Sequence, residues 1–487
     1  MRSPVYRIFV RCSLAICTGW SCVAAVPALA DPAVYEIGHD PGVGFNLISW
    51  WSGTQASHWQ AGIQTMYDAG FRDVSISPLR FFNTSTGALT TSGAPSLTGL
   101  ASGVAFAKSL GMHVTLNPFV EPINFTMWRG QYNPSGAAAT TFWTGYQSYL
   151  LEVAQIAHTH NVDAMLVGTE LRAITRDSSH NADWNNAINA VRAVYDGPLG
   201  YAANWDNYNH PNVAAAIWEH PEINFMGIDS YFNNVVTAYA SSVGATNAQL
   251  NNALDNNIGL PQIPGQSLTE MITAAWNRKL DNEILPYAAA RKDGAGLPVV
   301  FTEFGHLPYN RTARSPQNET NQPVDTAEQI AAFQGLMNAL DGRADKFHAM
   351  HIWQWHMTGS DGSLWNIRPT LPTNQPNNVP LGQWLSAFVN TAVAPLAGDY
   401  NRDGVVDAAD YTVWRNSLGD FVAHFHAADG DGNGRIDEAD YIVWKNAYDT
   451  TAGSGSIASG NVPEPATLPL AFAAFAHLLM RRRRRPT

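Results

Sequence analysis

Residues 161–173 read NVDAMLVGTELRA and place a glutamate directly after a short apolar run. An uninterrupted apolar run such as 164–167 is typical of a parallel strand that is buried on both faces. Its backbone groups are paired within a sheet, whereas an ionised carboxylate at its end needs partners or water. The stretch therefore predicts a buried parallel strand that ends at a chemically useful Glu170.

Similar apolar runs recur along the chain and alternate with amphipathic stretches such as 141–158 and 184–194. The expected strands are 44–50, 73–77, 113–117, 164–169, 199–203, 225–229, 299–302 and 348–354. This alternation implies a parallel sheet, and eight strands in about 360 residues predict a (β/α)₈ TIM barrel with insertions. We expect the barrel domain to span residues 31–392, with its longest insertion between 231 and 297.

A barrel of this type carries its active site at the carboxyl ends of its strands. Glu170 follows the fourth expected strand, and Glu303 lies at the end of the seventh. Two carboxyl groups across one barrel mouth suit hydrolysis of a glycosidic bond, because one protonates the leaving oxygen while the other attacks or activates water. A separation of about 5 Å between them is the retaining arrangement. Glu170 and Glu303 are therefore the expected catalytic pair.

Four motifs make this prediction more specific. VGTEL (167–171), YAANWD (201–206), GIDSY (227–231) and PVVFTEFG (298–305) occur in this order. Together they resemble the endo-β-mannanases of glycoside hydrolase family 113, in clan A of retaining barrel glycosidases. The resemblance covers most of residues 44–356. It implies double displacement on β-1,4-mannan or glucomannan without a catalytic cofactor, with Glu170 as acid/base and Glu303 as nucleophile.

The resemblance also implies further substrate contacts around the pair. Tyr231 matches a tyrosine that hydrogen-bonds the nucleophile, and Asn204 and Trp353 match positions that line the subsite of the cleaved sugar. Arg80, after the second strand, is expected to orient the nucleophile as clan arginines do. The 16 tryptophans of the chain suit stacking on sugar rings. The expected substrate-binding residues are Asn204, Trp205, Asp229, Tyr231, Trp128, Arg129, Arg80, Trp353, Trp355 and Trp50.

One segment departs from the family pattern. Residues 117–121 read NPFVE where relatives tend to carry KPHVD, so a basic and an imidazole group are missing, although WRG (128–130) is kept. Polar contacts of this kind discriminate sugar hydroxyl groups. A β-glucanase or an exo-glycosidase of the same clan therefore stays open as an alternative. So does a non-catalytic glycan-binding protein of the cell surface.

A duplicated acidic loop follows the barrel domain. Residues 399–418 read DYNRDGVVDAADYTVWRNSL, and 429–448 read DGDGNGRIDEADYIVWKNAY, an offset of 30 residues. Oxygen ligands at loop positions 1, 3, 5, 9 and 12, a glycine at 6 and a backbone carbonyl at 7 are the spacing of a calcium loop. The sequence predicts two structural Ca²⁺ ions. The expected ligands are Asp399, Asn401, Asp403, Val405, Asp407, Asp410, Asp429, Asp431, Asn433, Arg435, Asp437 and Asp440.

The duplicated loops resemble a type I dockerin, which docks onto cohesin domains. The resemblance implies a small all-α, EF-hand-like module over residues 393–450, with a cohesin-like protein as partner. A Ser-Thr pair that often serves cohesin recognition is replaced here by Ala408-Ala409 and Glu438-Ala439. We expect the module to need metal for folding, because ten crowded oxygen ligands repel one another until Ca²⁺ binds.

The two ends of the chain look like export and sorting segments. Residues 1–30 have the basic, apolar and small-residue regions of a signal peptide. A linker at 451–461 precedes a tail at 462–487 that resembles the PEP-CTERM signal, which an exosortase-type protease cuts. These features predict a secreted or cell-surface protein. Without the eight arginines of the two ends, the formal charge falls from −12 to −20, which argues against nucleic acid as a partner.

Overall fold

The computed structural model describes residues 42–317, 321–343, 346–355, 357, 363–369, 376–391, 398–400, 405–419, 428, 430 and 436–448. The predicted signal peptide, the linker and the sorting tail all lie outside these residues. Within the described residues, no helix is both long enough and apolar enough to cross a membrane.

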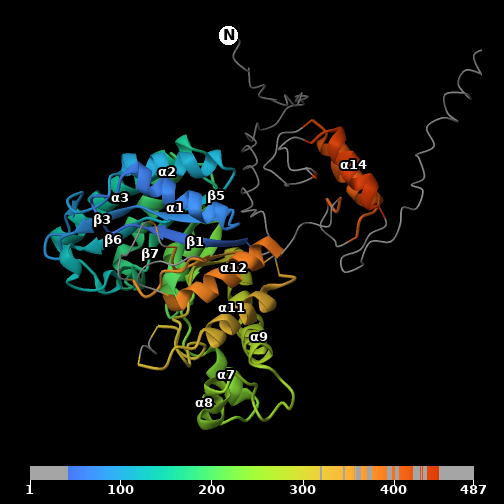
Figure 1. Cartoon of the computed structure of the whole chain (residues 1–487). Coiled ribbons are helices and arrows are strands. Elements are labelled where there is room, and N and C mark those ends of the chain that lie inside the picture. The colour runs from blue at the N-terminus through green and yellow to red at the C-terminus, as the bar shows by residue number, and fades with distance from the viewer. Residues whose placement is uncertain are drawn as a thin grey trace, which may run out of the picture.

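Eight parallel strands close into a barrel, which confirms the predicted fold (Figure 1). Their order around the barrel is β1-β11-β10-β9-β8-β7-β5-β2. The bounds are β1 Gly42–Ile48, β2 Asp73–Ser77, β5 His113–Leu116, β7 Ala164–Thr169, β8 Leu199–Asn204, β9 Phe225–Asp229, β10 Val299–Phe304 and β11 Phe347–Ile352. The bounds of all eight match those of the predicted strands to within two residues, and Trp50 lies just after the end of β1.

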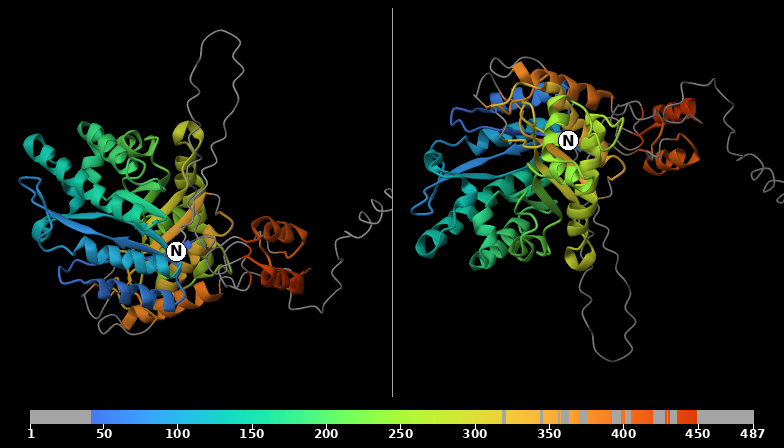
Figure 2. Two further views of the ribbon diagram at one scale, coloured as in Figure 1. Left: turned by 90° about the horizontal axis from the view of Figure 1, so that it is seen from above. Right: turned by 90° about the horizontal axis from the view of Figure 1, so that it is seen from below.

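Helices surround the strands, as the views from above and below show (Figure 2). The barrel helices are α1 Ala56–Asp68, α2 Leu97–Ser109, α3 Gly136–Thr159, α4 Arg172–Arg176, α5 Asn181–Arg192, α6 Pro211–Val213, α11 Thr326–Leu340 and α12 Val379–Thr391. Helix α3 illustrates the pattern, because its buried Tyr146, Leu150, Val153 and Ala157 recur at steps of four, three and four residues. That spacing gives the helix one apolar face, which packs on the sheet.

Apolar side chains pack both inside the barrel and around it. Ala164, Leu166, Phe225 and Val300 belong to a small apolar cluster contributed by β7 to β11. A much larger core lies outside the strands, between them and the helices. The carboxyl ends of the strands therefore rest on a packed base, which holds the side chains at the mouth in place.

A second, three-stranded sheet extends the barrel at the side of β2 and β5. It has the order β4-β3-β6, with bounds β3 Leu79–Phe82, β4 Leu89–Thr90 and β6 Phe119–Pro122. β3 and β6 follow β2 and β5 almost directly and pair in parallel, as their parent strands do. This sheet was not predicted from the sequence. It carries residues 119–122 beyond the barrel rim.

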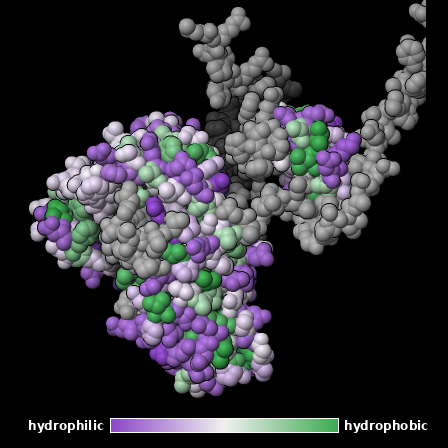
Figure 3. Space-filling view, viewed as in Figure 1, coloured by the Kyte–Doolittle hydropathy of each residue, from purple (hydrophilic) through white to green (hydrophobic). Residues whose placement is uncertain are grey.

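The predicted long insertion is largely helical. It contains α7 Val235–Ser242, α8 Asn247–Asp255, α9 Leu268–Lys279 and α10 Leu285–Ala289. α9 packs on both α7 and α11, so the insertion is joined to the barrel wall. α7 and α8 form the green projection in Figure 1, and the surface over them is mainly hydrophilic in Figure 3.

The described part of the C-terminal module consists of two helices, α13 Ala408–Ser417 and α14 Glu438–Ala447, seen as the red pair in Figure 2. They are linked by two reciprocal hydrogen bonds: Trp414 Nε1 donates to the carbonyl of Asp437, and Trp444 Nε1 donates to that of Asp407, each at 2.8 Å. The sequence duplication thus becomes an approximate twofold arrangement.

Candidate active site

Glu170 follows directly after strand β7, where the backbone departs from regular strand geometry. The register between β7 and β8 shifts between Leu166 and Thr169, and Glu170 itself has φ of +52°. A bulge of this kind at the end of a strand re-aims the following side chain. Gly168, two residues earlier, leaves room for Tyr146, since a Cβ on Gly168 would lie 2.7 Å from the Tyr146 hydroxyl oxygen, which donates to the carbonyl of Val167.

Three donors surround the carboxyl group of Glu170. Arg129 Nη2 and Trp128 Nε1 donate to Oε2 at 2.7 and 3.3 Å, and the side-chain amide of Asn204 donates to Oε1. The ring of Trp128 packs over Gly130, two residues later, where a Cβ would lie 2.3 Å from it. Strand β8 and the loop after β6 thus hold the glutamate that β7 presents.

Glu303 lies in β10, where the pairing with β9 also shifts register between Phe301 and Glu303. Tyr231, directly after β9, donates its hydroxyl hydrogen to Glu303 Oε2 at 3.0 Å. Glu303 Oε1 is buried and has no hydrogen-bond partner within the described part of the chain. Asp229 pairs with Glu303 in register and accepts a hydrogen bond of 2.7 Å from Thr302.

Burial and like charge dominate the electrostatics of this group. Burial, together with the negative charges of Asp229 and Glu170, raises the pKa of Glu303 well above its ordinary value of 4.5. Burial and the charge of Glu170 raise the pKa of Asp229 in the same way. Arg129 opposes both shifts. The negative charges of Glu170, Asp229 and Glu303 thus act on one another, and such shifts are typical of catalytic sites.

Arg129 is the cationic centre of the site. Its Nη1 donates to Glu121 Oε1 at 2.5 Å, its Nη2 to Glu170, and its Nε to the carbonyl of Thr169 at 3.3 Å. Its guanidinium lies 4.6 Å from the ring centroid of Phe119. The side chains of Arg129 and Glu121 are both nearly buried, so solvent screens their ion pair weakly.

The predicted aromatic platforms fall into two groups. Trp50, Trp205 and Trp353 are half-buried, and Trp128 is exposed. Trp353, which follows β11, stacks on Phe119 with ring centroids 6.0 Å apart. These four rings have open surface near the ends of the strands. They therefore stay available for stacking on a sugar.

Two of the predicted substrate-binding residues lie elsewhere. Trp355 is fully buried against Phe45 and Phe71, and its indole nitrogen donates to Thr65 of α1 at 3.2 Å, so it is a core residue rather than a sugar platform. The prediction for Trp355 was wrong because three residues beyond the end of β11 the chain has already turned into the layer between strand and helix.

Arg80 also departs from its predicted role. It lies on β3, and its guanidinium forms an ion pair of 3.0 Å with Glu152 of α3. Its guanidinium therefore contacts the surrounding helix layer and not Glu303. The unpredicted strand β3 is the reason, since it carries Arg80 past the barrel rim.

Sequence reasoning did not assign a role to Glu121 or to Trp365. Glu121 holds Arg129, and the ring of Trp365 meets that of Tyr231 edge-on at 5.6 Å. The position of Glu121 could have been suspected, because it stands at the acidic end of the segment that departs from the family pattern. No local signal marks Trp365, which reaches the site from a loop far along the chain.

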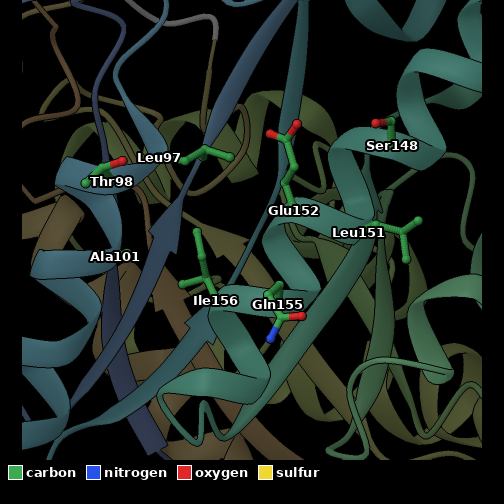
Figure 4. A pocket seen from close by; sticks show the side chains of 8 residues that line it. All are labelled: Leu97, Thr98, Ala101, Ser148, Leu151, Glu152, Gln155 and Ile156. Carbon is green, nitrogen blue, oxygen red and sulfur yellow. The ribbon is translucent and has the colours of Figure 1, made fainter.

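A mostly apolar groove of about 660 Å³ lies on the outer wall of the barrel, away from the carboxyl groups described above. Leu97, Thr98 and Ala101 of α2 line one side, and residues of α3 line the other (Figure 4). Glu152, the partner of Arg80, is among them. The groove is thus formed by packed helices rather than by strand ends.

The calcium loops are described only in part. Asn401, Asp403, Asp429, Asp431, Asn433 and Arg435 lie outside the described residues. Asp410 and Asp440 are fully buried, and each accepts two backbone hydrogen bonds of 2.7 to 2.8 Å within its own loop. The described residues contain no cluster of three or more metal-ligating side chains. The oxygen donors that are described fit a hard cation such as Ca²⁺.

Comparison with known protein families agrees with this geometry. The model of Glycoside Hydrolase Family 113 matches residues 49–363, more than half of the chain. The chain belongs to glycoside hydrolase family 113. A second model, the dockerin type I domain, matches residues 397–447. A search of the curated proteins found no match.

Solved structures of the family share the fold. The GH113 β-mannanase AaManA from Alicyclobacillus acidocaldarius, in complex with ManMIm, has a TM-score of 0.50 and 16% identity, over 74% of this chain and 99% of that one. Two structures of GH113 β-1,4-mannanase have TM-scores of 0.50 and 0.51, also at 16% identity. They cover 72% and 73% of this chain and 98% and 99% of theirs. At this level of identity the likeness concerns the fold.

Proposed function

We propose that this chain is a secreted, retaining glycoside hydrolase that cleaves β-1,4-mannan or glucomannan by double displacement. The observation that carries the proposal is that Glu170, directly after β7, and Glu303, near the end of β10, stand at the carboxyl ends of two strands of one closed barrel. Membership of family 113 supports the reaction class. The mannanase structures with the same fold support the choice of sugar.

In the first step, Glu170 gives its proton to the oxygen of the leaving sugar while Glu303 attacks the anomeric carbon. The glycosidic bond breaks and an ester forms between the substrate and Glu303. Tyr231 positions Glu303 through the bond to Oε2 and leaves Oε1 free of partners among the described residues. Oε1 is therefore the oxygen that we assign to the attack.

In the second step, Glu170 removes a proton from water, which attacks the anomeric carbon and releases Glu303. The three donors around Glu170 match its ionised form, which is the state required for this step. The net result is one water consumed, one glycosidic bond cleaved and the anomeric configuration retained. No metal or cofactor takes part in these steps.

Reducing-sugar release from mannan, glucomannan and β-glucan tests the proposal. The wild type should release sugar from mannan or glucomannan, and Glu303→Gln should lose at least about 10³-fold in kcat, as expected when a nucleophile is removed. Glu152→Gln is a matched control, because it changes a glutamate on α3 outside the site. NMR of the first product should show the retained anomer.

Each other outcome has a defined meaning. Preference for β-glucan would replace the mannanase assignment with a glucanase of the same clan. Absence of turnover by the wild type on every glycan, with binding retained, would indicate a glycan-binding protein. Equal activity of wild type and Glu303→Gln would contradict the catalytic assignment.

For the C-terminal module, we propose two bound Ca²⁺ ions and a cohesin-like partner. The dockerin type I match supports both, since domains of this type bind calcium and cohesins. The pairing of α13 with α14 brings together the two halves of the duplication.

Export by residues 1–30 and processing of 462–487 by an exosortase-type protease complete the proposal, and detection of the mature ends by mass spectrometry would test them.

A further inference from the structure

A row of aromatic rings runs from the end of β11 to the solvent. Trp353 stacks on Phe119 at 6.0 Å, and Phe119 meets Trp50 edge-on at 5.8 Å. Trp50 meets Phe125 at 5.8 Å, and Phe125 meets Phe81 at 5.7 Å, again edge-on. We call these five residues the aromatic row. They come from β3, from β6 and the loop after it, and from the segments that follow β1 and β11, so only the fold brings them together.

The rings of the aromatic row differ in exposure. Phe119 and Phe81 are buried and serve as its base. Trp50 and Trp353 are half-buried, and Phe125 is 55% exposed. Large apolar side chains usually gain stability by leaving water, and the ring of Phe125 gains little in this way. Its position therefore needs another reason.

The backbone at Phe125 is strained as well. Asn124 and Phe125 have φ of +60° and +51°, two consecutive residues in the left-handed region. Asparagine tolerates this region, but a residue as bulky as phenylalanine rarely adopts it. Strain that persists in an exposed loop is typical of binding sites, where the surrounding structure holds a side chain ready.

The same loop reaches the catalytic carboxyl group. Three residues after Phe125, Trp128 donates to Glu170, and Arg129 follows with its bonds to Glu170 and Glu121. The face of Phe119 is close to the guanidinium of Arg129, which is already paired. The aromatic row is therefore continuous with the active site and ends in an uncharged, exposed ring.

We propose that the aromatic row is an extended binding site for the substrate chain, in which Trp50 and Phe125 stack on uncharged sugar rings beyond the cleaved unit. This inference rests on the proposed function. The occupant is a β-linked neutral polysaccharide, because the flat C–H faces of its sugars pack on aromatic rings and the row presents no charged side chain for an ionic ligand. Phe125 is separated from Trp353 by the rings of Phe119 and Trp50, so we expect it to contact only sugars of longer chains.

The test compares a manno-trisaccharide with a manno-hexasaccharide. In Phe125→Ala, the ratio of kcat/KM for the long over the short substrate should fall about tenfold relative to wild type, the effect of losing one good aromatic contact. Phe125→Tyr keeps the ring and should keep the ratio. Ile258→Ala removes a similarly exposed apolar side chain outside the row and should leave both rates unchanged.

Phe125→Asn separates binding from folding. Asparagine accepts positive φ, so this variant should keep the melting temperature of the wild type while it loses the preference for the long substrate. Calorimetric titration in a Glu303→Gln background should show the same loss of hexasaccharide affinity without turnover. A lowered melting temperature with an unchanged length preference would make Phe125 a packing residue and overturn the proposal.

Different results would refute the proposed hydrolase function and the binding role of the aromatic row. Absence of turnover by the wild type on any polysaccharide removes the proposed function. An active Phe125→Ala enzyme with an unchanged ratio of long to short substrate overturns the aromatic row alone. An unchanged ratio together with lost binding of a protein partner would assign the exposed rings to that partner instead.

Discussion

The ion pair between Arg129 and Glu121 should be one of the strongest polar interactions of the barrel. The two side chains are 9% and 6% exposed, and the closest atoms are 2.5 Å apart. Arg129 also neutralises Glu170 at 2.7 Å. Replacing Arg129 by methionine keeps most of the side-chain volume but leaves two carboxyl groups without their cation. We therefore expect a large loss of stability.

The magnitude follows from burial. Breaking a buried pair by removing one partner costs about 3–5 kcal/mol, because the remaining charge stays in a poorly solvated place. Burial raises the pKa of Glu121 even though Arg129 lowers it, which shows how costly this environment is for the charge. Without Arg129, Glu121 should take up a proton more readily, so the cost of Arg129→Met should decrease as the pH is lowered.

A double-mutant cycle measures the pair itself. Urea unfolding at pH 7, followed by tryptophan fluorescence, gives the free energies of unfolding for wild type, Arg129→Met, Glu121→Gln and the double variant. We expect a coupling energy of about 3 kcal/mol. The pair of Arg80 with Glu152 is the matched control, because it has the same chemistry at 3.0 Å but a half-exposed glutamate.

For the control pair we expect a coupling energy below about 1 kcal/mol, as measured for exposed ion pairs. Equal coupling energies in the two cycles would refute the argument that burial sets the strength of the Arg129 pair. The argument would also be refuted if Arg129→Met left the free energy of unfolding unchanged, since the carboxyl groups of Glu121 and Glu170 would then have found another partner.

Three further predictions follow from charge and metal binding. Burial and the charge of Asp229 raise the pKa of Glu303, and the nucleophile must be ionised, so Asp229→Asn should move the acid limb of the kcat/KM profile to lower pH; an unmoved limb would argue against the coupling. Burial raises the pKa of Glu328 from 4.5 to about 8, so the folded state binds this proton more tightly and the free energy of unfolding should fall as pH rises between those values. Glu328→Gln should flatten that slope in thermal melts, and a slope that persists would assign it to other groups. EDTA should reduce the near-UV circular dichroism of the full chain by the contribution of packed Trp414 while hydrolysis continues, whereas a spectrum insensitive to EDTA would contradict the calcium sites.

The barrel was predictable because its signals are local. Most of the strands are apolar-rich runs of four to seven residues, as in β7, and helical patterns lie between several of them. The order of strands around a parallel barrel then follows from chain order. The duplicated loops were equally readable, since helix α13 begins right after Asp407, whose side chain caps it by accepting from Ala409.

The errors of the sequence analysis have a common cause. Arg80 and Trp355 both follow a barrel strand closely, and position after a strand is what placed them in the site. In the structure, β3 continues beyond the rim and directs Arg80 toward α3, and the chain after β11 turns Trp355 into the core. Whether a side chain near a strand end faces the mouth depends on bulges and extra strands, which have no clear local signal.

By itself, the amino-acid sequence determined the closed parallel sheet, the identity of the two catalytic glutamates as candidates, and the calcium-loop spacing, because periodicity and motif spacing act over a few residues. Only the tertiary structure decided that Arg129 links Glu121 to Glu170, that Tyr231 donates to Glu303, and that rings from five separate segments form one row. These contacts join residues far apart in the chain, and the closing of the barrel is the physical event that brings them within reach of one another.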